Sequence, residues 1–294
     1  MVSDGIREWE AAGPRIDADG DQVWMVELPA LGTETGDPVF VLHGFPTCSY
    51  DWRHVLPTLR DGRRVVLFDL PGFGLSDKPN VRYSIRRYAD AAEAVAAAAG
   101  LERVALVTHD LGDSVGGELL ARSLEGALGF EVTQRVITNG SIYMDLVQLT
   151  EGQQLLLAAA DEPVDLAALG VDPEPGFKAG LAGTFAIPAT DEELDAQWAL
   201  VSRADGHKLL TRTIRYIEDR RAEERRFTGP IETHPSPLAI VWGALDPVAV
   251  LPMAERLHSV RADSTLTVLD GVGHYPMIEA PDRFAAACAA GLAG

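Results

Sequence analysis

Two overlapping patterns that could hold a nucleophile occur in residues 103–126, RVALVTHDLGDSVGGELLARSLEG. Residues 112–116, GDSVG, fit the G-x-S-x-G turn that presents a reactive serine, here Ser114. Residues 108–112, THDLG, fit a version of the same turn with Asp110 at its centre. A serine needs a base to remove its proton, whereas an aspartate is already ionised at neutral pH. The two patterns therefore predict different chemistry: attack on a carbonyl, or displacement at a saturated carbon or strained ring.

The position of the preceding strand decides between them, because the reactive residue of this turn directly follows a strand and precedes a helix. The apolar run Arg103–Val107 predicts the strand, which puts the turn at 108–112 and Asp110 at its apex. Ser114 would lie one helical turn further on, about 6 Å along the axis. Placing Ser114 at the apex would bury the Asp110 carboxylate within the sheet at a high free-energy cost. We therefore predict Asp110 as the nucleophile, and Ser114, Gly116 and Gly117 as small residues that let the helix approach the sheet.

An ester formed on Asp110 must be hydrolysed, which needs a base to activate water and N–H donors to hold the oxyanion. His274 follows the predicted strand 266–269, and Asp246 follows the predicted strand 238–241. Considered one at a time, His274 could be a surface histidine and Asp246 a helix N-cap. Together with Asp110, however, they give the order nucleophile, acid, histidine after successive strands, which favours a catalytic triad. The N–H groups of Phe45, within HGFP at 43–46, and of Leu111 are the predicted oxyanion donors.

Strands and helices alternate along most of the chain. This alternation predicts an α/β fold with a mostly parallel central sheet and helices on both faces. It stops between about 143 and 235, where helical pieces occur without a convincing strand. We expect an α/β core at 1–142 and 232–294, with a helical cap inserted at 143–231. The predicted strands are 22–28, 38–42, 64–68, 103–107, 135–138, 238–241 and 266–269, and the predicted core helices are 86–99, 112–124 and 281–292.

The composition restricts the partners. The chain is 47% hydrophobic and 23% charged, as is typical of a globular protein, and its net charge of -19 argues against nucleic acid and anionic membranes. Cys48 and Cys288 form no metal or redox spacing, so we expect no metal, no organic cofactor and a cytoplasmic location. We see neither a signal peptide nor an apolar run long enough to span a membrane. The expected partners are a small apolar organic substrate and water, and assembly as a homodimer is left open.

The segments HGFPTCSYDW, FDLPGFGLSDKP, THDLGD, WGALDP and GVGHYPMIEAP together resemble the α/β-hydrolase superfamily over nearly the whole chain. The His-Asp pair at the turn is similar to the branch with aspartate nucleophiles, which includes epoxide hydrolases and haloalkane dehalogenases. HGFPT-SYDW with HD-GD is particularly similar to the mesoderm-specific-transcript-like hydrolases. The resemblance implies an α/β-hydrolase fold with a cap and a covalent aspartyl ester.

The resemblance also bears on the substrate. Haloalkane dehalogenases hold the halide with side-chain donors, yet Leu111 and Phe45 occupy the usual positions here and carry none, which leaves Trp198 as one donor. Epoxide hydrolases protonate the opening ring with cap tyrosines. Tyr216 lies where that family places one of its pair, and Tyr143 is the candidate for the other. We therefore expect an enzyme that opens an epoxide to a diol, with Tyr216 as its proton donor.

Three alternatives stay open: a haloalkane dehalogenase, a serine esterase that uses Ser114, and a non-catalytic ligand-binding homologue. The last is disfavoured because a binding protein needs no triad. We expect His109 to support the turn, although it could line the pocket instead, and His43 to order the HGFP loop. The residues expected to bind or surround the substrate are His43, Pro46, His109, Tyr143 and Trp198.

Overall fold

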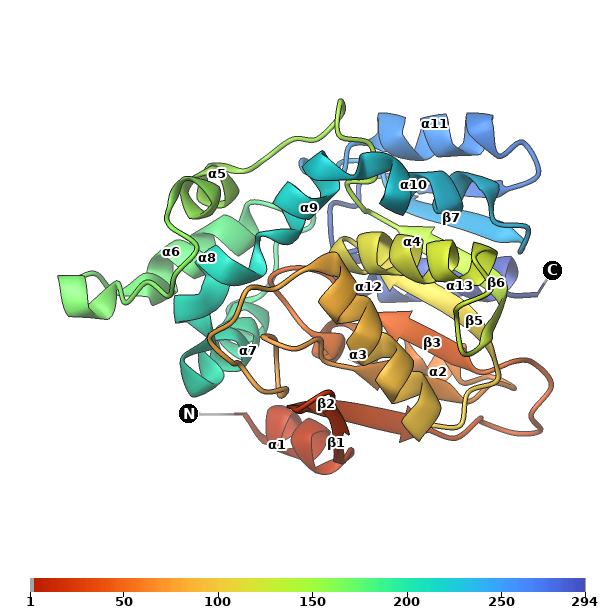
Figure 1. Cartoon of the computed structure of the whole chain (residues 1–294), viewed down its shortest axis with the longest axis horizontal. Helices are drawn as coiled ribbons and strands as arrows, with labels where there is room; N and C mark the ends of the chain where they lie inside the picture. The colour runs from red at the N-terminus through yellow and green to blue at the C-terminus, as the bar shows by residue number, and fades with distance from the viewer. Residues whose placement is uncertain (1–2, 294) are drawn as a thin grey trace.

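An eight-stranded sheet forms the centre of the molecule in the computed structural model, which describes residues 3–293 (Figure 1). The strand order is β1-β2-β4-β3-β5-β6-β7-β8. The β1–β2 and β2–β4 pairs are antiparallel, and all other neighbours are parallel. The predicted fold class is thereby confirmed. The strands are β1 (Arg15–Ala18), β2 (Asp21–Leu28), β3 (Val39–Leu42), β4 (Val65–Phe68), β5 (Arg103–His109), β6 (Glu131–Thr138), β7 (Leu238–Gly243) and β8 (Thr265–Leu269).

The central strands form because they consist of apolar, mostly β-branched residues that helices cover on both faces. Every residue of β3, β4 and β7 is buried, and so is all of β5 except Arg103. The sequence analysis missed β1, because its sequence RIDA is only four residues long and half of them are charged. It also ended β5 two residues early. Thr108 and His109 continue the ladder with Ile137 and Thr138 of β6, and the turn begins only after them.

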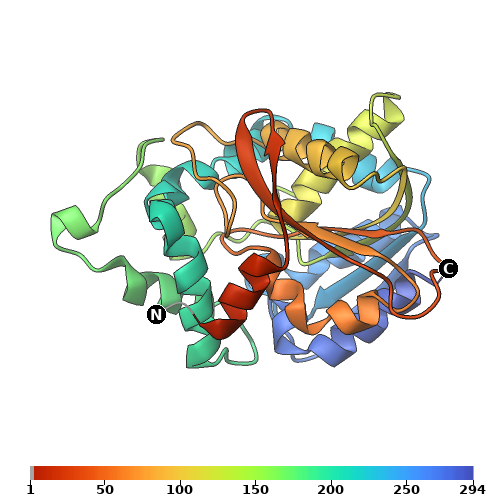
Figure 2. The ribbon, with the colours of Figure 1, turned by 90° about the horizontal axis from the view of Figure 1, so that it is seen from below.

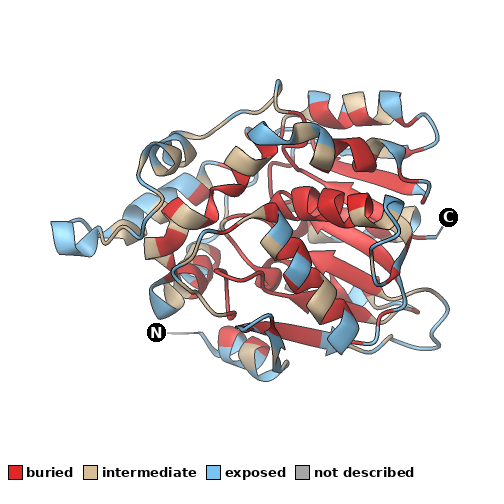
Figure 3. Ribbon diagram, viewed as in Figure 1, coloured by how far each residue is buried: buried red, intermediate tan, exposed pale blue. Residues whose placement is uncertain are grey.

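Helices cover both faces of the sheet, and two separate apolar clusters fill the space beneath them (Figure 2). Helices α3, α4, α10 and α11 contribute to one cluster, and α1, α2, α12 and α13 contribute to the other. Figure 3 shows the buried sheet and the largely buried α4 at the centre. The α-helices are α1 (Asp4–Ala11), α2 (Leu56–Leu59), α3 (Ile85–Ala98), α4 (Leu111–Leu124), α5 (Glu151–Ala158), α6 (Pro173–Ala182), α7 (Asp191–Ser202), α8 (Leu210–Thr213), α9 (Tyr216–Ala222), α10 (Glu224–Thr233), α11 (Leu251–Val260), α12 (Pro276–Glu279) and α13 (Pro281–Gly291).

The segment between β6 and β7 is helical, from α5 to α10, and contains no strand among its described residues. Helices α5 to α8 gather at the left of Figure 1, beyond one end of the sheet, and α9 leads back towards the core. Helix α10 packs against α4 and contributes Phe227 and Ile231 to the core cluster. It therefore belongs to the layer that covers the sheet, although residues 224–231 fall within the range in which we expected the cap.

Helix α4 approaches its neighbours closely through small residues. A Cβ at Gly116 would lie 3.1 Å from Thr108 of β5, and one at Gly117 would lie 2.0 Å from the carbonyl oxygen of Phe227 in α10. Ser114 accepts a hydrogen bond of 3.2 Å from Arg220 of α9. The prediction that small residues let α4 approach the sheet is therefore right for Gly116. Gly117 and Ser114 instead face the helices that cover α4.

Replacing Gly117 by alanine tests this close approach. Because the atom that a Cβ would meet belongs to the backbone, Gly117→Ala must push α10 away from α4, and we expect a loss of about 1–3 kcal/mol in the free energy of unfolding. Equilibrium unfolding in urea measures this loss. Gly129→Ala is the matched control, since nothing lies within 4 Å of the added Cβ. Equal stability of the two variants would contradict the assignment.

Candidate active site

Asp110 occupies a sharp turn between β5 and α4, with φ 51° and ψ -112°. A non-glycine residue in such a sparsely populated region costs about 1–3 kcal/mol, and surrounding structure must maintain it. Two glycines make that packing feasible. A Cβ at Gly112 would lie 2.5 Å from the carbonyl oxygen of Leu42, and one at Gly44 would lie 2.6 Å from the Cβ of Asp110. The turn therefore fixes the carboxylate above the carboxyl end of β5.

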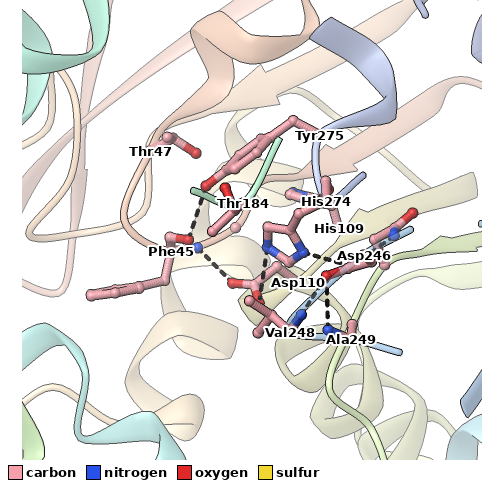
Figure 4. A network of polar contacts seen from close by, with 12 residues as sticks. Phe45, Thr47, His109, Asp110, Thr184, Asp246, Val248, Ala249, His274 and Tyr275 are labelled. Carbon is pink, nitrogen blue, oxygen red and sulfur yellow. Dashed lines mark hydrogen bonds and ion pairs between the residues drawn. The ribbon is translucent and has the colours of Figure 1, made fainter. Parts of the chain in front are cut away.

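The two oxygens of the Asp110 carboxylate have different surroundings (Figure 4). Oδ1 accepts a hydrogen bond of 2.8 Å from the backbone N–H of Phe45, and Oδ2 lies 3.7 Å from Nε2 of His274. Leu111 is the first residue of α4, so the helix does not use its N–H. Oδ1 is thus bound by one of the two predicted oxyanion donors, the Phe45 N–H, whereas Oδ2 faces the imidazole.

His274 and Asp246 form the remainder of the predicted arrangement. Nδ1 of His274 donates a hydrogen bond of 2.7 Å to Oδ2 of Asp246. The other oxygen of Asp246 accepts from the N–H groups of Val248, at 2.7 Å, and Ala249, at 3.0 Å. The imidazole is therefore held with Nε2 directed at Asp110, which is the geometry a base needs to act on water beside that residue.

Burial by itself lowers the pKa of His274, but the negative charge of Asp246, its hydrogen bond and the charge of Asp110 outweigh burial and raise this pKa to about 9. At neutral pH the imidazole is therefore protonated. Removing the charge of Asp110 would therefore lower the pKa of His274.

Asn139 is a positioning residue that the sequence analysis missed. It directly follows β6, and its side-chain amide donates a hydrogen bond of 2.7 Å to Oδ2 of Asp246. Its side-chain oxygen accepts from the N–H of Gly243 at 2.9 Å. Its φ of 47° is one that asparagine tolerates better than most residues. A polar residue directly after a strand of a parallel sheet was the available signal.

Glu279 was also missed, and it fixes the loop that carries His274. Its carboxylate accepts four backbone hydrogen bonds, two from Gly273 and Tyr275 on either side of His274 and two from Ala186 and Ile187 in the helical insertion. The N–H of His274 itself donates to the carbonyl of Thr184 at 3.1 Å. One carboxylate thus joins the histidine loop to the insertion.

His43 and His109 support the site from below. His43 donates from Nδ1 to the carbonyl of Gly44 at 2.8 Å and accepts at Nε2 from the N–H of Leu70 at 2.9 Å. Nε2 of His109 donates to the carbonyl oxygen of His274 at 2.8 Å. Burial lowers the pKa of both histidines, which keeps their rings neutral. Neither histidine lines the cavity. His43 therefore supports the HGFP loop, and His109 supports the loop that carries His274.

A cavity of about 480 Å³ opens above this arrangement, within the range typical of small-molecule sites. Phe45, Pro46, His274 and Tyr275 line its inner end, and Trp198 lies in its wall. The structure thus brings Pro46 and Trp198 to the cavity, as expected.

Neither of the two predicted tyrosines lines the cavity, and their neighbours differ. Tyr143 is outside the cavity, because its hydroxyl donates to Glu232 at 3.1 Å and the Arg256 guanidinium covers its ring, so its expected place at the substrate is corrected. Tyr216 is 1% exposed and is not part of the cavity lining either. Its ring packs 5.9 Å from that of Phe45, whose N–H binds Asp110.

Ser114 is not part of the His274 arrangement. Its hydroxyl is buried against Arg220, and the described side-chain contacts of His274 involve Asp110, Asp246 and neighbouring rings. Within residues 3–293, no group of three or more His, Cys, Asp or Glu residues could hold a metal ion. Over the same residues, none of the helices has both the length and the apolar character needed to cross a membrane.

Comparison with known proteins identifies relatives along the whole chain. A model of the alpha/beta hydrolase family matches residues 39–287. The putative hydrolase LipZ of Mycobacterium tuberculosis is 36% identical over 290 residues, which cover 98% of each chain. The mesoderm-specific transcript homolog protein of Homo sapiens is 32% identical over 297 residues, which cover 97% of this chain and 87% of that protein. The predicted resemblance is confirmed.

Solved structures agree on the fold. The haloalkane dehalogenase DatA of Agrobacterium tumefaciens C58 superimposes with a TM-score of 0.78 at 21% identity, covering 96% of both chains. The epoxide hydrolase CorEH gives a TM-score of 0.77 at 17% identity, covering 96% of this chain and 98% of that one. At these identities the similarity concerns architecture alone.

The charge arrangement around His274 can be tested by NMR titration. We expect the labelled His274 imidazole to titrate at about pH 9 in the wild-type protein. Asp110→Asn removes a charge that raises this pKa, so the pKa should fall. Asp113→Asn is the control, because burial already raises the pKa of Asp113 well above its usual value and so favours the uncharged acid. Equal pKa values in the two variants would show that Asp110 does not influence His274.

Proposed function

The chain belongs to the alpha/beta hydrolase family, and from this premise we propose that it hydrolyses its substrate through a covalent ester on Asp110 and that the substrate is an epoxide. The observation that carries the proposal is the position of the Asp110 carboxylate between the Phe45 N–H and Nε2 of His274. A carboxylate in this place can attack carbon with one oxygen while the other already lies in the oxyanion site.

In the first step Oδ2 of Asp110 attacks a ring carbon of the epoxide. The new carbon–oxygen bond forms as the ring carbon–oxygen bond breaks, and the ring oxygen takes the phenol proton of Tyr216. No base is needed, because the attacking group is already an anion. Burial raises the pKa of Tyr216 well above its usual value, so the phenol carries its proton at neutral pH.

Formation of the ester changes the state of His274. The charge of Asp110, which helps to raise the pKa of His274, is lost when Asp110 becomes a neutral ester. The imidazolium then gives up its proton more readily, and this proton restores the Tyr216 phenol. The neutral imidazole becomes available as a base at the step that needs one.

In the second step His274 removes a proton from water, whose oxygen attacks the ester carbonyl. Negative charge develops on Oδ1, where the N–H groups of Phe45 and Leu111 stabilise it. The alkoxide leaves with the proton of the newly formed acid, which regenerates the Asp110 carboxylate and the protonated His274. The net reaction adds one water molecule to give a diol.

The alternatives receive less support. Displacement of a halide needs donors directed at the departing anion, and the positions of Leu111 and Phe45 supply no side-chain donor. A serine mechanism would need the Ser114 hydroxyl beside His274, whereas it is buried between α4 and Arg220. A binding protein would need none of the Asp246, Asn139 and Glu279 contacts that orient the histidine.

Isotope labelling tests the aspartyl ester. After a single turnover in water enriched in ¹⁸O, peptide mass analysis should find the label in the peptide that contains Asp110. Asp110→Asn should abolish steady-state turnover unless the amide is hydrolysed back to aspartate, whereas Ser114→Ala should retain turnover and lose mainly stability. An unlabelled Asp110 peptide, together with acylation of Ser114 by an ester analogue, would replace this mechanism with a serine one.

The role of Tyr216 is tested by comparing two tyrosine variants on epoxide substrates. Tyr216→Phe should lower the rate of ring opening by about 10²–10⁴-fold, the usual contribution of a general acid. Tyr143→Phe should leave the rate nearly unchanged, since that hydroxyl is bonded to Glu232. Tyr216, by contrast, packs on Phe45 and is close enough to Asp110 for its charge to raise the tyrosine pKa. The rate is measured as the single-turnover formation of the ester. If both variants behaved like the wild type, Tyr216 would not be the proton donor.

A further inference from the structure

The outer part of the cavity has an unusual surface. Ten large hydrophobic side chains are exposed among residues 3–293, and four of them fall within the stretch 155–171. Leu155 and Val171 are 72% and 52% exposed, and with Leu166 they line the cavity where it opens to solvent. Single exposed apolar residues are ordinary, but a group at the mouth of a cavity marks a binding surface. We call Leu155, Leu166, Leu169 and Val171 the apolar rim.

Helix α5 carries part of this rim and packs against the core only in part, through Leu156 and Leu157. Its sequence EGQQLLLA contains three leucines, yet none of its residues is buried (Figure 3). Leu155 and Leu156 face the cavity instead. An apolar helix with no buried residue leaves its hydrophobic surface to water unless a ligand covers it.

The helix is nevertheless fixed in place. The buried guanidinium of Arg215 donates hydrogen bonds to the carbonyl groups of Leu156, Leu157 and Ala159 at the end of α5. At the other end, Thr150 and Gln153 form a reciprocal capping box. These polar contacts, together with the partial packing of Leu156 and Leu157 against the core cluster, hold the leucines of α5 at the cavity. The open apolar wall is a built feature of the fold.

The apolar surface is continuous from the rim to the reacting groups. Leu156, Phe177 and Leu181 line the cavity between α5 and α6, and Val248 lies near its inner end beside Phe45 and His274. The lining also includes Asp172, whose side chain caps α6 at the N–H of Glu174. The lining also includes Lys208, whose ammonium is paired with Asp165 and Asp205. Because the charged groups of the lining already have partners and the chain has a net charge of -19, a substrate with an anionic tail is disfavoured.

We propose that the substrate carries a long, uncharged alkyl chain. Its reactive group lies at Phe45 and His274, its chain follows Leu156 and Phe177 outward, and its end covers the apolar rim. The assignment of the reactive group rests on the proposed function, whereas the alkyl site does not. Each methylene that leaves water contributes about 0.8 kcal/mol, which is about fourfold in affinity.

Binding of straight-chain primary alcohols from butanol to decanol, measured by titration calorimetry on the whole protein, tests the alkyl site without any reaction. We expect affinity to rise about fourfold with each added methylene until the chain passes the rim. Leu155→Asp and Val171→Asp should weaken decanol binding by about tenfold or more and leave butanol binding unchanged. Both positions are exposed, so circular dichroism and urea unfolding should show intact folds.

Leu124→Asp is the matched control, because Leu124 is 50% exposed at the end of α4 and does not line the cavity. It should bind both alcohols like the wild type. Affinity that does not depend on chain length would overturn the proposal, and so would an equal loss in the Leu124 variant. A loss for butanol as large as that for decanol would overturn it as well.

Turnover of straight-chain terminal epoxides of the same lengths separates this proposal from the proposed function. Chain-dependent alcohol binding without any epoxide turnover would support the alkyl site and contradict the epoxide reaction. Turnover of short epoxides, together with alcohol binding that does not depend on chain length, would support the epoxide reaction and contradict the alkyl site. If both proposals hold, kcat/KM should rise with chain length and fall in Leu155→Asp for the long epoxides alone.

Discussion

The strained backbone at Asp110 is the constraint on which the rest of the site depends. A φ of 51° at a residue other than glycine persists because β5, α4 and the loop after β3 pack around it without room for a Cβ at Gly44 or Gly112. The same packing brings the Phe45 N–H to the carboxylate. The strain and the placement of the reactive group are thus one feature, since relaxing the turn would move the carboxylate away from its donors.

Charge balance is the second organising element. Asp110 and Asp246 flank one imidazole, and together they outweigh the effect of burial on its pKa. The two carboxylates beside the imidazolium are buried, and fixed N–H donors stabilise their negative charge: Phe45 for Asp110, and Val248, Ala249 and Asn139 for Asp246. Converting Asp110 to an ester changes this balance, which links the protonation of His274 to the stage of the reaction.

The helical insertion combines a firmly attached side with an open one. Helix α7 is joined to the core through the Arg53–Glu193 ion pair and through the Gln197 amide, which donates to the buried carboxylate of Asp51 at 2.8 Å. Burial raises the pKa of Asp51 to about 7, so this group is only partly ionised at neutral pH. Helix α5 lines another part of the cavity and has no buried residue. The insertion thus attaches α7 firmly to the core and exposes the apolar side chains of α5 at the opening of the cavity.

The sequence by itself determined which residues follow strands, because apolar runs bounded by polar turns mark the strands of a covered parallel sheet. That was enough to predict Asp110, His274 and Asp246 as one group. Tertiary structure decided what local pattern cannot encode. Asn139 and Glu279 act through contacts between distant segments, and the Tyr143 hydroxyl is bonded to Glu232. Leu155 and Leu156 of QQLLLAAA line a cavity, although the leucine spacing is equally typical of a core helix. The physical reason is that periodicity reports which face of an element is apolar, whereas only packing decides what that face meets.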